Sequence, residues 1–144
     1  MTTHDNKEIV GRYLAEVVNG RMLDVADCIL SPDFAMDRSG VAGTTKTPAS
    51  FCNMMAGFTA AFPDFQVAVE EVVAERDAVA VRLGWRGTQQ GEFRGMPASG
   101  RPFAVTGSAV YHVIDGRITR AWEQLDLFAL IEQIGAPSTI GSTD

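Results

Sequence analysis

Residues 47–70, TPASFCNMMAGFTAAFPDFQVAVE, decide the fold because the hydrophobic period changes within them. Thr47 is a good N-cap, Pro48 suits the first helical position and Pro63 ends the segment. Between these residues the apolar side chains recur at helical spacing, at Phe51, Met54, Met55, Phe58 and Phe62. After Pro63 the apolar residues alternate with polar or small ones, at Phe65, Val67 and Val69. A helix is therefore followed by a strand.

The chain before this stretch predicts two helices and one short strand. Ile9, Tyr13 and Val17 recur every four residues, which predicts a helix over about 6–18 that ends at Asn19-Gly20. A second, short helix is expected over 22–30, before Ser31-Pro32. Residues 33–36 are expected to form a short strand, and residues 37–46 a loop.

The chain after residue 70 continues with strand periodicity. Strand-like runs cover 79–85, 103–114 and 117–125, and Arg76-Asp77 and Asp115-Gly116 stand where hairpin turns belong. Residues 127–134 predict a short final helix, and residues 137–144 a frayed tail rich in Ser, Thr and Gly. Helices followed by a meander of antiparallel strands indicate an α+β fold with its helices on one side of the sheet.

Length and composition favour one soluble globular domain over residues 1–144. Apolar residues make up 46% and charged residues 21% of the 144 residues, values typical of folded domains. The net charge is −6 and no run of Lys or Arg occurs, which argues against nucleic-acid binding. No apolar stretch is long enough to span a membrane, and no signal peptide is recognisable. We expect a cytoplasmic protein whose two cysteines, Cys28 and Cys52, are free thiols.

No pattern of metal-ligating, nucleophilic or phosphate-binding residues is present. The two histidines, His4 and His112, stand alone, and HExxH, CxxC, GxSxG, Walker and GxGxxG motifs are all missing. We therefore expect neither a metal nor an organic cofactor. Any chemistry would be acid–base work by side chains.

Two motifs resemble those of a known family. Residues 87–103, GTQQGEFRGMPASGRPF, resemble the central signature of the SnoaL-like polyketide cyclases, and residues 115–126, DGRITRAWEQLD, with 130–135, LIEQIG, resemble that family's closing strand and helix. The resemblance covers nearly the whole chain. It implies an NTF2-like cone, in which a curved antiparallel sheet wraps around three N-terminal helices and opens into an apolar pocket. Such cones serve many reactions and also plain binding, so the function has to be argued from the site.

Glu123 is the leading candidate for an acid–base group. By strand alternation it shares a face with Thr119, Ala121 and Leu125, and a carboxylate among such neighbours is easier to protonate. The resemblance implies the same role, since in these cyclases an aspartate after the Trp-like residue acts as general acid and base in an intramolecular aldol closure. Alternatively, Glu123 is a solvated carboxylate or a partner of Arg120.

A histidine that those cyclases carry one strand back is replaced here by Ala109. His112 is three residues further along, on the opposite face of the strand, so it does not replace the missing histidine. A histidine there is more often structural or part of an interface. The replacement weakens the assignment of an aldol reaction.

Two other residues indicate a rival reaction. Arg12-Tyr13-Leu14, Asn19-Gly20 and Asp37 resemble the N-terminal part of ketosteroid isomerase. The resemblance implies that Tyr13 polarises a carbonyl and that Asp37 shuttles a proton between carbons. Alternatively, Tyr13 belongs to the core and Asp37 to a turn.

We expect a hydrophobic, polycyclic or polyketide-derived carbonyl compound as substrate, with Glu123 as acid/base, Asp37 as auxiliary base and Tyr13 as hydrogen-bond donor. The expected substrate-binding residues are mostly large and apolar: Met36, Phe51, Met55, Phe58, Trp85, Phe93 and Ala109. The reaction would be an aldol-type cyclisation or an isomerisation. The alternatives are an accessory hydroxylase of aromatic polyketide biosynthesis and a non-enzymatic protein that binds small hydrophobic ligands.

The same strands predict a homodimer or larger homo-oligomer. Opposite the face of Glu123 and Ala109, the last two strands carry apolar or aromatic residues at Val110, His112, Ile114, Ile118 and Trp122. A contiguous apolar patch on a sheet usually marks an interface. A bulge in the last strand would change which residues lie on this face.

Overall fold

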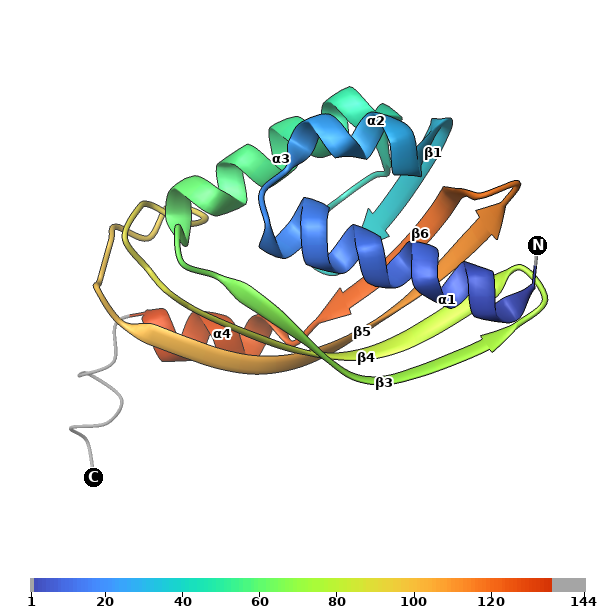
Figure 1. Ribbon diagram of the computed structural model, residues 1–144. Coiled ribbons are helices and arrows are strands. Elements are labelled where there is room, and N and C mark those ends of the chain that lie inside the picture. The colour runs from blue at the N-terminus through green and yellow to red at the C-terminus, as the bar shows by residue number, and fades with distance from the viewer. Residues whose placement is uncertain (1, 136–144) are drawn as a thin grey trace.

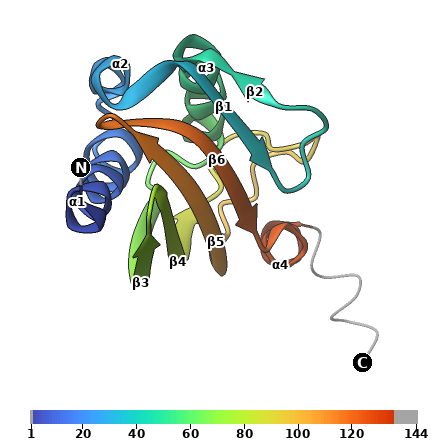
Figure 2. The same ribbon diagram turned by 90° about the vertical axis from the view of Figure 1, so that its right-hand side faces the viewer.

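The structure is a computed structural model that describes residues 2–135; the tail expected over 137–144 lies outside the described residues. It is a mixed α+β domain with one six-stranded sheet in the order β2-β1-β6-β5-β4-β3. The strands are β1 (Leu30–Arg38), β2 (Thr45–Lys46), β3 (Gln66–Glu75), β4 (Ala78–Thr88), β5 (Pro102–Ile114) and β6 (Arg117–Leu125). Figures 1 and 2 show the sheet strongly curved, as the NTF2-like expectation required.

The helices lie mainly on one face of this sheet, which we call the inner face (Figure 1). They are α1 (Thr3–Arg12), the π-helix η1 (Tyr13–Asn19), the 3-10 helix η2 (Leu23–Val25), α2 (Ala26–Ile29) and α3 (Thr47–Ala61). The short helix α4 (Leu127–Ile134) follows β6 and lies apart from them (Figure 2). Its Gln133 side chain exchanges two hydrogen bonds with the backbone of Ala104, so α4 covers the part of β5 that extends beyond β6.

Local sequence signals explain most element boundaries. The first helix begins earlier than expected because Thr2 and Asp5 form a capping box. Helix α3 carries the apolar face predicted for it, and the Thr47 hydroxyl accepts a hydrogen bond from the Ser50 amide at 3.2 Å. Both predicted hairpin turns are present, and Asp115 and Gly116 take the left-handed conformation that a tight turn of this kind requires.

The strand β1 differs most from expectation. It runs from Leu30 to Arg38, so Asp37 belongs to a strand and not to a loop. It pairs in parallel with β6, whereas the other pairings in the sheet are antiparallel. This parallel pairing places Arg38, the last residue of β1, beside Glu123 near the end of β6.

A bulge in β6 corrects one residue of the predicted outer face. The register with β5 shifts between His112 and Val113, which pair with Arg120 and Ile118 respectively. The extra residue turns Ile118 inward, where it is fully buried, while Trp122 stays on the outer face. The expectation that Ile118 lies on the outer face is therefore wrong.

Candidate functional site

Glu123 lies on the inner face of the sheet in an ion pair. Its register partner on β1 is Arg38, and Arg38 Nε stands 3.0 Å from Glu123 Oε1. The two side chains are only 15% and 7% exposed, respectively. A buried carboxylate is costly without a counter-charge, and the Arg38 guanidinium supplies one. Arg120, the alternative partner that the sequence offered for Glu123, forms its ion pair with Asp37 instead.

Arg38 is the residue that sequence reasoning missed. The strand was expected to end before it, and its partner lies 85 residues further along the chain. The only usable signal was the acid at position 123, which requires a counter-charge if it is buried.

Two tyrosines lie in the electric field of this ion pair. Burial raises the pKa of Tyr13 well above its ordinary value, and the Glu123 carboxylate raises it further, while Arg38 acts in the opposite direction. Burial likewise raises the pKa of Tyr111, with further contributions from Tyr13 and Glu123. The two rings meet edge to face with their centroids 5.5 Å apart. Both phenols are therefore neutral hydrogen-bond donors over a wide range of pH.

The Tyr111 hydroxyl is buried without a hydrogen-bond partner among the described residues. Tyr13 is the first residue of the π-helix η1, an unusual backbone form that is frequent at functional sites. The structure thus brings Tyr13 and Glu123 to one region, together with Arg38 and Tyr111.

Ala109 is the direct neighbour of Glu123 on β5. It is buried, so the position at which the resemblance implied a histidine does face the candidate carboxylate. His112 lies on the outer face, 4.9 Å from the Trp122 ring. The structure therefore brings no histidine to Glu123 from β5.

Asp37 is not brought to this cluster. Its neighbour on β6 is Trp122, and its carboxylate accepts hydrogen bonds from Thr44 and Arg120 on the outer face. The strands β1 and β6 thus carry two ion pairs on opposite faces, Arg38–Glu123 inside and Asp37–Arg120 outside.

The apolar residues expected to bind substrate lie in the core beside the inner face. Five of them are buried and Phe93 is partly buried: Met36, Phe51, Met55, Phe58 and Trp85. The Phe58 ring contacts those of Trp85 and Phe93, with centroids 5.9 Å and 6.1 Å away. The Trp85 indole nitrogen, like the Tyr111 hydroxyl, is buried without a hydrogen-bond partner in the described part of the chain.

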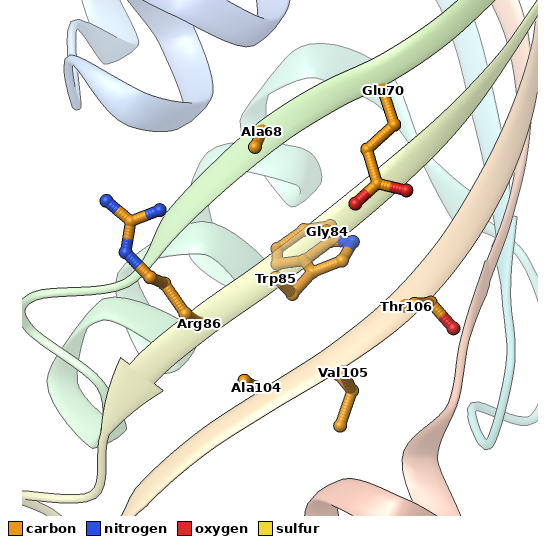
Figure 3. A pocket seen from close by; sticks show the side chains of 8 residues that line it. All are labelled: Ala68, Glu70, Gly84, Trp85, Arg86, Ala104, Val105 and Thr106. Carbon is orange, nitrogen blue, oxygen red and sulfur yellow. The ribbon is translucent and has the colours of Figure 1, made fainter.

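A groove on the opposite side of the sheet is separate from this cluster. It has a volume of about 330 Å³ and crosses β3, β4 and β5 on the outer face (Figure 3). Its floor is formed by small residues, Ala68, Gly84 and Ala104, with Glu70 and Arg86 at its sides. Glu70 is engaged with Arg82 at 2.8 Å, and we assign no chemistry to this groove.

Residues 2–135 contain neither a cluster of metal ligands nor a membrane-spanning helix. No three His, Cys, Asp or Glu side chains gather there as metal ligands would, and no helix there is long and apolar enough to span a membrane. Independence from cofactors stays a prediction.

Solved structures with this fold are numerous. A candidate SnoaL-like polyketide cyclase from Jannaschia sp. CCS1 is 27% identical, with a TM-score of 0.87 and coverage of 94% of each chain. IdmH, a candidate polyketide cyclase from Streptomyces antibioticus, is 27% identical over 89% of this chain and 96% of its own, with a TM-score of 0.79. AclR, a candidate hydroxylase from Streptomyces galilaeus, is 25% identical over 90% of this chain and 95% of its own, also with a TM-score of 0.79.

No curated protein matches the sequence. The family model of the SnoaL-like polyketide cyclases, in contrast, matches residues 8–134, from the first helix to the last. With the curved sheet and the two sequence motifs, this match shows that the chain belongs to the SnoaL-like polyketide cyclase family.

Proposed function

We propose that this protein is an acid–base enzyme, independent of cofactors, that removes a proton from the carbon next to a carbonyl group of a hydrophobic polycyclic or polyketide-derived compound. The observation that carries the proposal is the buried Glu123 carboxylate, held by Arg38 on the inner face of the sheet among apolar side chains. A carboxylate is a suitable base for this step only if it is shielded from water and fixed in position. Membership of the cyclase family supports the same class of reaction.

In the proposed step, the Glu123 carboxylate takes the proton as the C–H bond breaks. The electron pair of that bond moves onto the carbonyl oxygen and forms an enolate. Attack of the enolate carbon on a second carbonyl of the same molecule closes a ring by an aldol reaction, with the proton returned to the new alkoxide. Return of the proton to a different carbon gives an isomerisation.

Arg38 and Tyr13 have supporting roles in this proposal. Arg38 fixes the carboxylate through the bond to Oε1 and leaves Oε2 as the oxygen that can accept the proton. Tyr13 donates a hydrogen bond to the enolate oxygen, which its raised pKa permits because the phenol stays protonated. Asp37 has no role in the step, since its carboxylate lies on the outer face beside Arg120.

A pair of isosteric variants tests the assignment. The compound that co-purifies with the protein is identified by mass spectrometry, and its conversion is followed after dialysis against a chelator. We expect Glu123→Gln to abolish conversion and to change ligand affinity by less than about tenfold, because only proton transfer is lost. Asp37→Asn, on the same strand pair but the opposite face, is the matched control and should retain activity. Conversion that survives in Glu123→Gln would refute the proposal, whatever the result for Asp37→Asn.

One observation favours a second candidate function, binding of a small hydrophobic ligand without chemistry. Ala109 stands opposite Glu123, so β5 supplies no second acid–base group there. This candidate predicts that the co-purifying compound is released unchanged by the wild-type protein.

A further inference from the structure

The loop between β4 and β5 carries the central family motif, and the proposed function gives it no role. Its two ends meet in a narrow neck, where the Gln89 amide donates a hydrogen bond to the Arg101 carbonyl and the Gly100 amide donates one to the Gln89 carbonyl, both at 2.9 Å. Compact loops with adjoining ends are frequently functional. In Figure 1 this loop lies beside the C-terminal end of α3.

The side chain of Gln89 holds the loop together from inside. It is fully buried, and its amide group fills all four of its hydrogen-bonding positions. Nε2 donates to the carbonyls of Gly91 and Met96, both at 3.1 Å, while Oε1 accepts from the Ser99 hydroxyl at 2.8 Å and from the Ser99 amide at 3.2 Å. The two arms of the loop are therefore tied to each other, so residues 90–98 can move as one body.

The tip of the loop is a tight turn over residues 93–96. The amides of Phe93 and Met96 donate to each other's carbonyls, at 3.0 Å and 2.9 Å. Between them, Arg94 and Gly95 have φ values of 52° and 83°, the left-handed conformation that a type I′ turn uses at both central positions. The turn fixes the shape of the tip, from which the Phe93 and Arg94 side chains reach two different neighbours.

Phe93 and Arg94 join this tip to the rest of the protein. The Phe93 ring contacts those of Phe58 and Phe62, with centroids 6.1 Å and 5.0 Å away. Arg94 Nη2 donates a hydrogen bond to the Gly40 carbonyl at 2.7 Å, and this bond is exposed to solvent. An exposed hydrogen bond contributes little to global stability, so it can break and re-form while the fold stays intact.

Gly40 directly follows the chain segment that holds Glu123. Arg38 forms the ion pair with Glu123, and the next residue, Ser39, exchanges hydrogen bonds with the backbone of Leu125 at 2.9 Å and 3.1 Å. The tip of the loop is thus fastened beside the segment that fixes the candidate base.

The surroundings of Glu123 are closed in this structure. The Glu123 side chain is 7% exposed, and Met55 and Phe58 on α3 are 6% and 7% exposed. A polycyclic compound therefore reaches the inner face only if part of the chain moves aside. Helix α3 is anchored by buried apolar side chains, whereas most of residues 90–98 are exposed, and a segment of that kind opens more easily than a packed helix.

We infer that residues 90–98 form a gate over the inner face, which opens when Arg94 releases Gly40 and Phe93 leaves Phe58. The inference rests on the proposed function, because it takes the inner face as the ligand site, and it adds the route by which a ligand enters and leaves. Arg94 is the latch of this gate. The buried amide of Gln89 keeps its moving part in one piece.

Two backbone amides report the opening of this gate. Those of Gln90 and Gly91 donate to the Ala61 carbonyl at the end of α3, at 2.8 Å and 3.1 Å, so they lose their partner when the gate opens. The amides of Gln89 and Gly100 belong to the neck and keep their partners. Hydrogen exchange of the protein without ligand, followed residue by residue by NMR, should therefore be faster at the first two amides than at the neck.

Replacing the latch should change this local opening and nothing else. Arg94→Met should speed exchange at Gln90 and Gly91 by about three- to tenfold and leave the neck amides unchanged, because one hydrogen bond of the closed state is lost. Arg76→Met is the matched control, since Arg76 is another exposed arginine in the left-handed conformation, with φ 55°, in the turn between β3 and β4. It should leave the exchange of both reporter amides unchanged.

Prodan, a fluorescent naphthyl ketone, tests whether the gate controls access. Its association and dissociation rate constants are measured by stopped-flow fluorescence. Because a gate limits entry and release alike, Arg94→Met should raise both rate constants by about three- to tenfold and change Kd by less than about twofold. A residue that contacts the probe or supports the shape of its site would change Kd instead.

Two results would overturn the inference. One is that Gln90 and Gly91 exchange at the same rate in the wild-type protein and in Arg94→Met. The other is that both proteins have the same rate constants for Prodan. Neither measurement involves conversion, so either result leaves the assay on Glu123→Gln untouched. Conversely, a gate that passes both tests, together with full conversion by Glu123→Gln, would refute the proposed chemistry alone.

Discussion

Replacing Arg38 by methionine should be one of the most damaging single changes to a charged residue of this protein. Methionine retains much of the volume of the side chain and removes the charge, which leaves the Glu123 carboxylate buried without its partner 3.0 Å away. Loss of one member of a buried pair typically costs about 3–5 kcal/mol. Because water still reaches part of Arg38, we expect the lower end, about 3 kcal/mol, or a fall in Tm of about 6–12 °C for a chain of this size.

Arg120→Met is the matched control for this measurement. It breaks the other ion pair between the same two strands, but Arg120 and Asp37 are 30% and 39% exposed, and such pairs contribute about 0–1 kcal/mol. Adding Glu123→Gln to Arg38→Met should recover about 1–3 kcal/mol, because no uncompensated charge remains. Urea unfolding followed by circular dichroism gives all four free energies. A loss of unfolding free energy in Arg38→Met no larger than that in Arg120→Met would contradict the conclusion that Arg38 and Glu123 form a buried ion pair on which the fold around the site depends.

The remaining predictions concern the tyrosines and the outer face. Tyr13 and Tyr111 are the only tyrosines, and both have a pKa raised by burial well above the ordinary value near 10, so absorbance titration should show no tyrosinate near pH 10 while the protein is folded. The resulting stability is fully present below about pH 10 and is lost as the pH rises further, since only the unfolded chain ionises there; tyrosinate formation at pH 10 in the folded protein would contradict this. Tyr111→Phe should raise the free energy of unfolding by about 1 kcal/mol, because it removes a buried hydroxyl that has no partner among residues 2–135; a fall of similar size would show that the hydroxyl does have a hydrogen-bond partner. Trp122→Asp should convert a homodimer into a monomer of 15.5 kDa in light scattering, because its register partner Val110 and, further along β5, Ile114 are exposed on the same face; a wild-type mass near that of one chain would exclude the dimer.

Local patterns were enough to predict the helices and the hairpins. The apolar spacing of Phe51, Met55 and Phe58 predicted α3, and Asp115-Gly116 predicted the last turn, because both features depend on residues close together in sequence. The position of Glu123 on the inner face also followed from strand alternation. These predictions needed no knowledge of what lies opposite each strand.

Pairings between distant segments could not be predicted in this way. The ion pair of Arg38 and Glu123 depends on parallel pairing of β1 with β6, for which neither strand carries a local signal. The inward turn of Ile118 depends on a bulge that no glycine marks in that strand. Asp37 resembled a catalytic aspartate by its distance from Tyr13 in the sequence, yet the alternation of β1 directs it to the outer face.

Deuterium exchange into a ketone probe tests the central claim, that Glu123 takes a proton from carbon. Androstenedione is incubated in D₂O with the wild-type protein or with Glu123→Gln, and label at the carbons next to each carbonyl is followed by mass spectrometry. The account predicts that wild-type protein accelerates exchange and that Glu123→Gln lowers this catalysed rate by about 10²–10⁴-fold, the contribution expected of a positioned base. Equal exchange rates for the two proteins would contradict it.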